Sequence, residues 1–528
     1  MNTNPSATLR TGVLYYGDNL DILRRYIPSD AIDLIYLDPP FNSNRSYNVL
    51  FRESSGAASE AQIEAFEDTW HWGPVAARAY EEVVSGPQQT VARMLRAMVD
   101  GLGHNDVTAY LSMMAVRLVE LHRVLKPTGS IYLHCDPTAG PYLRVLMDAI
   151  FGPMALRNEI IWKRTPFAGS SKARAQQLPR SHDMLLYYSK GHAWVWNAPT
   201  TPYLEQYLER FKWDDQDGRG SYRKTLLKTY SQETFERLKV EDRLIPPIKP
   251  GAKWSYKQYL SESSGTRQID DVWTDINAIN PVAKERLGYP TQKPLALLER
   301  IVNASSSPGD VVLDPFCGCG TAVHAAQKLG RRWLGIDVTH LAISLIRRRM
   351  QDAFPGLEVP VIGEPVDLAG ARDLAAHDKY QFQWWALDRL GAQPVAGKKK
   401  GADRGIDGVI PFFAGPKEDY KRAIVSVKGG EHVTVAMVRD LVGVLDREKE
   451  PIGVLVALEP PTQPMITEAA AAGFYHADFW QKDYPRVQII TIEQLLAGVR
   501  PQLPSTRSPF AQAPLEREVA QQGRLGGA

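Results

Sequence analysis

One short stretch near the amino terminus constrains the fold most: Asp38-Pro39-Pro40-Phe41, which directly follows the apolar run 32–37. That run (IDLIYL) has the nearly continuous hydrophobicity of a buried parallel strand. The two prolines end the strand, because neither can donate a hydrogen bond to a sheet ladder. An acid, two stiff residues and an aromatic ring therefore stand at the carboxyl end of a central strand, where open α/β sheets bind their ligands.

These side chains suit the methylation of an exocyclic amine on a nucleobase. The lone pair of such an amine is delocalised into the ring, so the nitrogen becomes nucleophilic only when hydrogen bonds draw it towards tetrahedral geometry. Asp38 and the backbone carbonyl beside Pro39 can each accept one amine hydrogen, and Phe41 offers a ring on which a flipped-out base can stack. An isolated D-P-P is more often a strand end with an acid-capped turn, so a second motif has to decide.

Composition sets broad limits on the chain. At 528 residues it is too long for one core, which predicts two or three domains. A net charge of +2 means that any DNA-binding surface must be a local patch. The three cysteines exclude a disulfide framework and lack the spacing of zinc ligands. We see no signal peptide and no apolar span of membrane length, and we expect a cytoplasmic protein without a membrane partner.

Strand and helix patterns alternate over the first 350 residues. Besides 32–37, strands are expected at 13–16, 130–134, 160–162, 311–314 and 333–337. Helices are expected at 20–26, 109–124, 141–151, 295–304 and 322–329. This order predicts a parallel α/β sheet covered by helices.

A basic segment interrupts the alternation. Residues 163–190 contain six basic side chains and one acid, Asp183, and irregularly spaced aromatic residues follow up to about residue 288. Basic residues interleaved with aromatic ones suit a surface that neutralises phosphates and contacts bases. A solvated, loop-rich insertion fits the same residues equally well. The basic candidates for contact with DNA are Lys163, Arg164, Lys172, Arg174 and Arg180.

The second motif is the run 311–321 (VVLDPFCGCGT), a strand ending in Asp314 followed by a glycine turn and a helix. Gly318 and Gly320 allow the backbone to approach a ligand closely. Val323 replaces the third glycine of a dinucleotide fingerprint, and no phosphate-binding G-K-[ST] follows. Asp337, about 20 residues further on, can hold ribose hydroxyls. The loop therefore favours an adenosine cofactor such as S-adenosylmethionine.

Taken together, the two motifs resemble those of the β-class DNA amino-methyltransferases, a permuted group whose catalytic motif precedes its cofactor motif. Asp38-Pro39-Pro40-Phe41 matches the family's D-P-P-[YF], and residues 314–321 match D-P-F-x-G-x-G-T. The resemblance covers roughly residues 11–350. It implies a Rossmann-like α/β methyltransferase fold, S-adenosylmethionine as cofactor and double-stranded DNA as substrate, with the basic-aromatic segment as target-recognition region.

The resemblance also implies roles for matching residues. Asp38, Pro39, Pro40 and Phe41 would hold and activate the target amine. The expected cofactor-binding residues are Asp314, Phe316, Gly318, Gly320 and Thr321 around the methionine part, Asp337 at the ribose, Asp18 at the adenine amine and Lys293 near the carboxylate. Aspartate in the catalytic motif favours adenine N6, since cytosine-N4 enzymes commonly carry serine there, and cytosine N4 stays the alternative. A release-factor-type methyltransferase would carry asparagine before Pro-Pro.

The carboxyl-terminal part resembles a PD-(D/E)xK nuclease core, closest to the Mrr-like restriction branch. Asp407 after a glycine turn, and a strand ending at Lys428, have the spacing of that core. Asp407 would bind a divalent cation such as Mg²⁺, and Lys428 would help to activate water. Two departures put cleavage in doubt: Ser426 replaces the usual Glu or Gln, and Gln383 replaces a common helix glutamate.

Three interpretations stay open: a methyltransferase whose extra domain only binds DNA, a single polypeptide that modifies and cleaves, and a non-catalytic DNA-binding protein. A homodimer or a separate restriction subunit is a further expectation. The expected domains are a catalytic half (1–162), a target-recognition region (163–288), a cofactor-binding half (289–350), a linker (351–375), a smaller α/β restriction-endonuclease-like domain (376–500) and a disordered tail (501–528).

Overall fold

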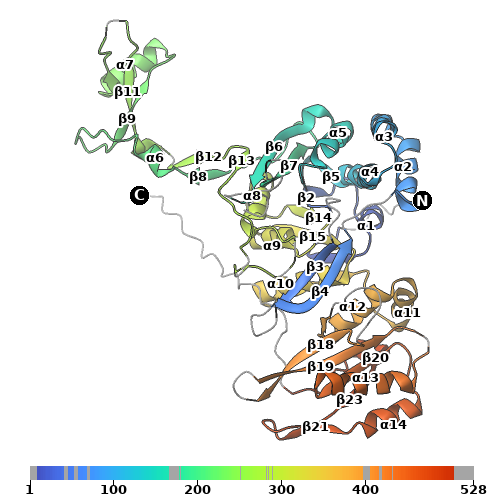
Figure 1. Ribbon diagram of the computed structural model, residues 1–528. Coiled ribbons are helices and arrows are strands. Elements are labelled where there is room, and N and C mark those ends of the chain that lie inside the picture. Colours follow the sequence, from blue (N-terminus) through green and yellow to red (C-terminus); the bar gives the residue numbers. More distant parts are fainter. Residues whose placement is uncertain are drawn as a thin grey trace. The chain divides into compact units, whose positions relative to one another are not determined.

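The apolar run 32–37 forms strand β2 at the centre of a mixed sheet in the computed structural model (Figure 1). The structure describes residues 9–40, 46–52, 58–67, 72–165, 178, 180–249, 251–263, 265–280, 282–283, 285–287, 289, 291–395, 405–415, 419–430 and 432–504. The predictions for Phe41, Lys172, Arg174 and the tail beyond 504 lie outside these residues.

Eight strands of the first compact unit (9–195 and 274–504 of the described chain) follow the order β6-β7-β5-β2-β14-β15-β1-β16. Their bounds are β1 Val13–Tyr16, β2 Ile32–Leu37, β5 Leu125–Cys135, β6 Leu156–Lys163, β7 His182–Ser189, β14 Val311–Asp314, β15 Arg332–Asp337 and β16 Val361–Ile362. The pairs between β5 and β16 in this order are all parallel. The expected parallel α/β core is therefore confirmed.

The other edge of this sheet differs from the prediction. Strand β7, which the sequence pattern did not predict, pairs antiparallel with both β5 and β6. Residues 160–162 therefore do not continue the parallel sheet, because the chain returns through β7 between β6 and β5. Strand β5 also begins earlier than expected, because the expected turn at 126–129 lies within the strand as a bulge. Ile32 pairs with Leu125 and Leu34 with Ser130, so the register shifts between them.

Helices cover the sheet: those expected at 20–26, 109–124, 141–151, 295–304 and 322–329 are present, whereas helices at 74–85, 89–102 and 340–353 were not expected. Helices α1 (Asn19–Tyr26), α2 (Pro74–Ser85), α3 (Gln89–Leu102), α4 (Asp106–Val124) and α5 (Gly140–Phe151) share one buried cluster with Ile35 and Leu37 of β2. Helices α8 (Leu295–Ser305), α9 (Thr321–Lys328) and α10 (His340–Ala353) alternate with β14 and β15 along the chain. Strands β3 (Ser46–Arg52) and β4 (Ala58–Glu67) form an antiparallel pair.

A second compact unit, Trp196–Trp273, lies within the predicted target-recognition region. Its elements are β8 Thr200–Pro202, α6 Glu205–Leu208, β9 Tyr222–Leu226, α7 Gln232–Val240, β10 Leu244–Ile245, β11 Ser255–Tyr259, β12 Thr266–Gln268 and β13 Val272–Trp273. Strands β10, β11 and β9 form one antiparallel sheet and β12 pairs with β8.

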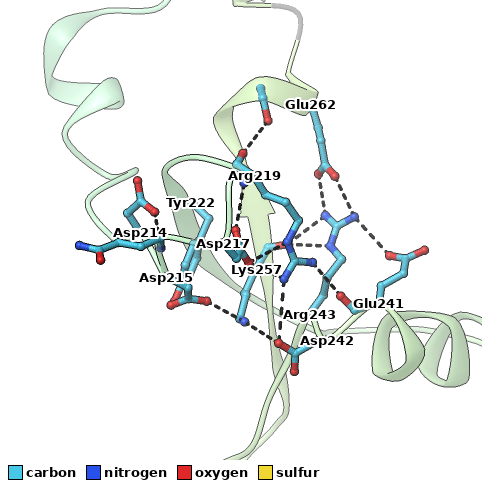
Figure 2. A network of polar contacts seen from close by, with 12 residues as sticks. Asp214, Asp215, Asp217, Arg219, Tyr222, Glu241, Asp242, Arg243, Lys257 and Glu262 are labelled. Carbon is cyan, nitrogen blue, oxygen red and sulfur yellow. Dashed lines mark hydrogen bonds and ion pairs between the residues drawn. The ribbon is translucent and has the colours of Figure 1, made fainter.

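A network of basic and acidic side chains in this second unit includes Arg219, Arg243 and Lys257, each of which pairs with an acid (Figure 2). Lys257 lies 2.7 Å from Asp215, and Arg243 lies 2.6 Å from Glu262. These contacts are on or next to the small β9-β11 sheet, so they hold its loops against the strands. Exposed ion pairs of this kind contribute little to stability individually.

The carboxyl-terminal domain, within the first unit, has its own smaller sheet with helices around it, as expected. Its sheet order is β17-β18-β19-β20-β23, antiparallel up to β19 and parallel from there. The strands are β17 Gln393–Pro394, β18 Gly408–Gly415, β19 Asp419–Lys428, β20 Ile452–Ala457, β21 Phe474–Ala477, β22 Lys482–Pro485 and β23 Val487–Thr491. The helices are α11 Leu368–His377, α12 Lys379–Leu390, α13 Val435–Glu448, α14 Gln463–Ala471 and α15 Ile492–Leu496.

Both faces of this smaller sheet are buried. Val425 and Phe412 belong to a cluster with α11, α12 and α15, whereas Ile424 belongs to another cluster with α13 and α14. The alternation of neighbouring residues between faces explains why β19 reads as an apolar run. In the part of the chain that the structure describes, no helix has the length and apolar character needed to cross a membrane.

Candidate active site

Four neighbouring parallel strands bring the predicted polar residues to one edge of the large sheet. Asp38 follows β2, Asp314 ends β14, Asp337 ends β15, and Asp18 follows β1 by two residues. These strands are adjacent in the order β2-β14-β15-β1, and all run in the same direction. Their carboxyl ends therefore meet at a single edge, although the residues come from opposite ends of the methyltransferase-like sequence.

A cavity of about 320 Å³ lies at this edge, which is within the usual range for small-molecule sites. Residues predicted from the sequence supply much of its lining: Asp18, Asp38, Pro40, Lys293, Asp314, Phe316, Gly318, Thr321 and Asp337. Pro39 is buried next to it, and Gly320 lies in the turn that forms one wall. The two sequence motifs therefore face one common cavity.

The glycine loop is shaped by left-handed backbone conformations. Gly318 has a φ of +52° and Gly320 a φ of +73°. A Cβ atom on Gly320 would lie 2.8 Å from the side chain of Ile346, which is closer than packing allows. The backbone N–H of Gly318 donates to Oδ2 of Asp337 over 2.9 Å. Glycine is thus required both by the backbone conformation and by the close packing against α10.

Asp38 forms a largely buried ion pair with Lys293, whose Nζ contacts Oδ2 of the carboxylate. Only 16% of the Asp38 side chain and 12% of the Lys293 side chain are exposed. The hydroxyl of Thr321, in the glycine loop, donates to the backbone carbonyl of Lys293 over 3.3 Å. The lysine that was expected near a cofactor carboxylate therefore contacts the catalytic-motif aspartate and is linked to the glycine loop.

The carboxyl groups of Asp314 and Asp337 have perturbed acidity. Asp314 is only 3% exposed, and burial, reinforced by the charges of Asp38 and Asp337, raises its pKa to about 8 against the opposing effects of the Phe316 N–H and Lys293. Burial also raises the pKa of Asp337, although hydrogen bonds from Thr339 and Gly318 oppose this. A positive charge in the cavity would stabilise the ionised form of both carboxyl groups, so the lining suits a cationic ligand.

Arg117 is a site residue that the sequence reasoning missed. It lies on α4, is 5% exposed and lines the cavity. Its Nη2 lies 2.8 Å from Oδ2 of Asp18, and its Nε donates to the Asn19 side chain over 2.7 Å. Asn19 in turn donates to the backbone carbonyl of Pro315 over 2.9 Å. The sequence did contain a signal for it, because Arg117 is the one charged residue in the apolar run 109–118. A charge on a buried helix face needs a partner, which indicates a polar site nearby.

Asp18 itself has two contacts at the cavity. Its carboxylate accepts a hydrogen bond of 2.7 Å from the backbone N–H of Leu20 and so caps helix α1. The carboxylate also accepts a hydrogen bond from the Arg117 guanidinium, which fixes the orientation of the Asp18 side chain. Because its side chain is still 48% exposed, the carboxylate has acceptor capacity for a ligand amine.

The described members of the predicted basic set have different surroundings. Nε of Arg164 lies 3.2 Å from Oδ1 of the buried Asp183. Burial acts to raise the pKa of Asp183, but His134 and Arg164 hold it below its usual value. Arg180 donates to the hydroxyl of Thr138 over 2.5 Å, and Lys163 is the last residue of β6. Arg164 is therefore already paired within the protein.

The predicted nuclease positions also come together, in the carboxyl-terminal domain. Oδ2 of Asp407 accepts from the backbone N–H of Val427 over 2.6 Å and from the Ser426 hydroxyl over 3.2 Å. Oδ1 accepts from the Gln383 side chain over 3.1 Å. Lys428 is two residues beyond Ser426 on the same strand, and therefore on the same face.

This arrangement does not fit a divalent cation. Ser426 replaces the usual Glu or Gln and Gln383 replaces a common helix glutamate, and both side chains donate a hydrogen bond to Asp407. Among the described residues, no cluster of three or more His, Cys, Asp or Glu side chains is placed to hold a metal ion. The predicted Mg²⁺ site at Asp407 is thus not supported.

Relatives of this chain include methyltransferases and a restriction-modification subunit. The type II methyltransferase M.EcaI of Enterobacter cloacae is 29% identical over 265 residues, covering 46% of this chain and 57% of the relative. The type III restriction-modification enzyme StyLTI Mod subunit of Salmonella typhimurium is 25% identical, covering 59% of this chain and 49% of the relative. The chain thus spans about half the length of these two relatives. DNA adenine methyltransferase YhdJ of Escherichia coli is 23% identical, covering 64% of this chain and 83% of the relative.

One similar solved structure is a putative DNA modification methylase from Thermus thermophilus, complexed with S-adenosyl-L-methionine. It has a TM-score of 0.34 and 18% identity, and the match covers 66% of this chain and 97% of that one.

Two family models match separate parts of the chain. Residues 379–497 match a model described as NACHT-associated inactive Restriction Endonuclease 1, so the chain carries a restriction-endonuclease-like domain of a type described as inactive. Residues 32–348, more than half of the chain, match the N6_N4_Mtase model, described as DNA methylase. The chain therefore belongs to the N6/N4 DNA methylase family.

Proposed function

We propose that this protein transfers a methyl group from S-adenosylmethionine to an exocyclic amine of a base in double-stranded DNA, with adenine N6 as the target. The observation that supports this most is the common cavity at the edge of the large sheet. It joins the Asp38 turn after β2 to the glycine loop after β14. A nucleophile bound at the Asp38 turn and a methyl donor bound at the glycine loop would be neighbours.

The residues that line the cavity fit the cofactor. Asp314, Phe316, Gly318 and Thr321 would surround its methionine part, and Gly320 would keep the turn open. Asp337 would accept the ribose hydroxyls and Asp18 the adenine amine, held in place by Arg117. The raised pKa of Asp314 supports binding of a cation, because S-adenosylmethionine is a sulfonium ion. When bound, the cofactor supplies an electrophilic methyl group attached to a good leaving group.

Asp38 would accept a hydrogen bond from the target amine and so localise the lone pair on nitrogen. Lys293 contacts Oδ2 of Asp38, but a carboxylate has about four acceptor sites, which leaves capacity for the amine. The backbone carbonyl beside Pro39 would accept the second amine hydrogen, Pro40 would shape the entrance, and Phe41 would stack on the base. Correct alignment of nitrogen and methyl carbon can lower the barrier by roughly 7–11 kcal/mol.

Adenine is favoured over cytosine by the aspartate in the catalytic motif. The base must leave the helix before it reaches the cavity, at a cost of a few kcal/mol. Contacts with the DNA backbone would offset this cost, and Lys163 and Arg180 are the described candidates. Arg164 is paired with Asp183, so it would act by positioning β7 more than by contacting phosphate. The unit Trp196–Trp273 would read the sequence.

For the organisation of the chain, we propose that residues 1–162 and 289–350 form one methyltransferase core with a target-recognition region of 163–288 between them. Residues 376–500 would form an accessory domain after a linker of 351–375. A separate restriction subunit is a reasonable partner because one relative is a Mod subunit. Self-association into a homodimer is the alternative.

The accessory domain would not cleave DNA. Asp407 is held by three donors from the protein itself, Gln383, Ser426 and the Val427 N–H. A cation would have to displace these donors without gaining the carboxylate ligands that hard divalent ions prefer. A protein that both modifies and cleaves DNA is thus the less favoured second function.

The test is methyl transfer from radiolabelled S-adenosylmethionine to unmethylated duplex DNA. Wild-type protein should label the DNA, and Asp38→Ala should abolish labelling while cofactor binding, measured by calorimetry, is largely retained. Asp38→Asn keeps nearly the same shape but lacks the carboxylate, so it separates the effect of the lost charge from that of the lost volume. Single-molecule sequencing of DNA from expressing cells would identify the base and the site. Near-normal turnover in Asp38→Ala, or absence of labelling by the wild type, would contradict the proposal.

A further inference from the structure

Helix α12 of the restriction-endonuclease-like domain packs against a cluster that extends to the lining of the cavity. Its Trp384 packs against a buried cluster that contains Leu341 and Leu345 of α10 together with Tyr289 and Cys319. The last two also line the cavity. The accessory domain therefore packs against a cluster that includes two residues of the cavity lining.

Gln381 of α12 makes polar contacts at the same place. Its Oε1 accepts a hydrogen bond of 3.2 Å from the backbone N–H of His340, the first residue of α10. It also lies 3.5 Å from the hydroxyl of Tyr16, the last residue of β1. The rings of Tyr16 and His340 are stacked, with their centroids 3.6 Å apart. One side chain of the accessory domain therefore joins the end of a strand to the start of a helix.

These two elements carry part of the cavity. Tyr16 is followed by Gly17 and Asp18, and His340 is preceded by Val338 and Thr339, and all four of these neighbours line the cavity. The first N–H groups of a helix have no partner within the helix. Thr339 caps one of them, at Ala342, and Gln381 supplies the partner for another. The position of the loop at 337–340 is thus set in part by a residue outside the methyltransferase core.

Charged residues hold α12 against α10. Asp388 pairs with Arg347 and lies 3.1 Å from Arg348. Glu364, which is 8% exposed, lies 3.2 Å from Arg389 and 3.7 Å from Arg347. Nδ1 of His340 lies 3.5 Å from the same glutamate. Linked pairs with little exposure resist separation more than isolated surface pairs do.

We propose that Gln381 is a positioning residue for the cofactor cavity, through which the accessory domain sets the affinity of the methyltransferase core for S-adenosylmethionine. The inference rests on the proposed function, because it takes the cavity to be the cofactor site. It gives the accessory domain a role that needs neither nuclease activity nor contact with DNA.

The test measures the dissociation constant of S-adenosylmethionine for the full chain by calorimetry. Gln381→Ala removes the acceptor, and the loss of about one net hydrogen bond should weaken binding roughly fivefold to tenfold. The KM for the cofactor should rise by a similar factor, while kcat at saturating cofactor stays at the wild-type value. Gln381→Glu keeps an acceptor oxygen and should bind close to wild type.

The matched control is Tyr380→Ala, the neighbouring residue on the same helix, whose side chain is 60% exposed. It should leave the dissociation constant unchanged. Equal affinity of Gln381→Ala and the wild type would overturn the proposal, as would an equal loss in Tyr380→Ala accompanied by a lower melting temperature. A wild-type protein that does not bind S-adenosylmethionine at all would instead refute the proposed function, and this inference with it.

Discussion

Asp314 should make cofactor binding depend on pH in a way that can be calculated. Its pKa of about 8 in the empty protein means that the carboxyl group is mostly protonated at neutral pH. The sulfonium of S-adenosylmethionine favours the ionised carboxylate, so binding should release a proton from Asp314. Affinity should therefore increase as the pH rises towards 8 and become constant above it.

The magnitude follows from the fraction of Asp314 that is ionised before binding. With a pKa of about 8, that fraction is about one tenth at pH 7 and one hundredth at pH 6. If only the ionised form binds well, the dissociation constant should fall about tenfold between pH 6 and 7, which is roughly 1.4 kcal/mol, and about fivefold between pH 7 and 8, where half of Asp314 is already ionised.

Calorimetry at several pH values between 6 and 9, in buffers of different ionisation enthalpy, would measure both the affinity and the protons released. The α-amino group of the cofactor also titrates in this range, with an ordinary pKa of roughly 7.7–8.0. Asp314→Asn separates the two, because the variant retains only the contribution of the ligand. If wild type and variant show the same slope and the same proton release, the assignment of the perturbed carboxyl to cofactor binding is wrong.

Three further predictions concern other parts of the chain. Asp38→Asn and Lys293→Gln should each lower the free energy of unfolding by about 3 kcal/mol, since each breaks a largely buried ion pair. The double variant should recover most of that loss; denaturant unfolding measures this, and simple additivity of the two losses would refute the coupling. Gly320→Ala should cost about 1–3 kcal/mol and weaken cofactor binding, because of its φ of +73° and the clash with Ile346; wild-type melting temperature and affinity would contradict this. Wild-type protein and Lys428→Ala should both leave duplex DNA intact in Mg²⁺, and cutting by the wild type that disappears in the variant would show an active nuclease.

The sequence by itself determined which segments end at the site. The apolar runs 32–37 and 311–314 fold as the buried parallel strands that their hydrophobicity predicts. The prolines after β2 and the glycines after β14 then place a turn at each strand end. These signals are local, because strand length, helix spacing and turn residues depend on neighbours in the chain. The α/β fold and the smaller second sheet followed from them, whereas the family followed from the resemblance of the two motifs to known ones.

Contacts between distant residues were decided only by the tertiary structure. Asp38 and Lys293 are separated by 255 positions and Asp18 and Arg117 by 99, so no periodic pattern links them. The antiparallel return of β7 and the contact of Gln381 with His340 likewise depend on which surfaces pack together. The acidity of Asp314 has the same origin, because it arises from burial and from the charges around it. Local chemistry determines where each strand ends, whereas packing determines which charges and donors each end meets.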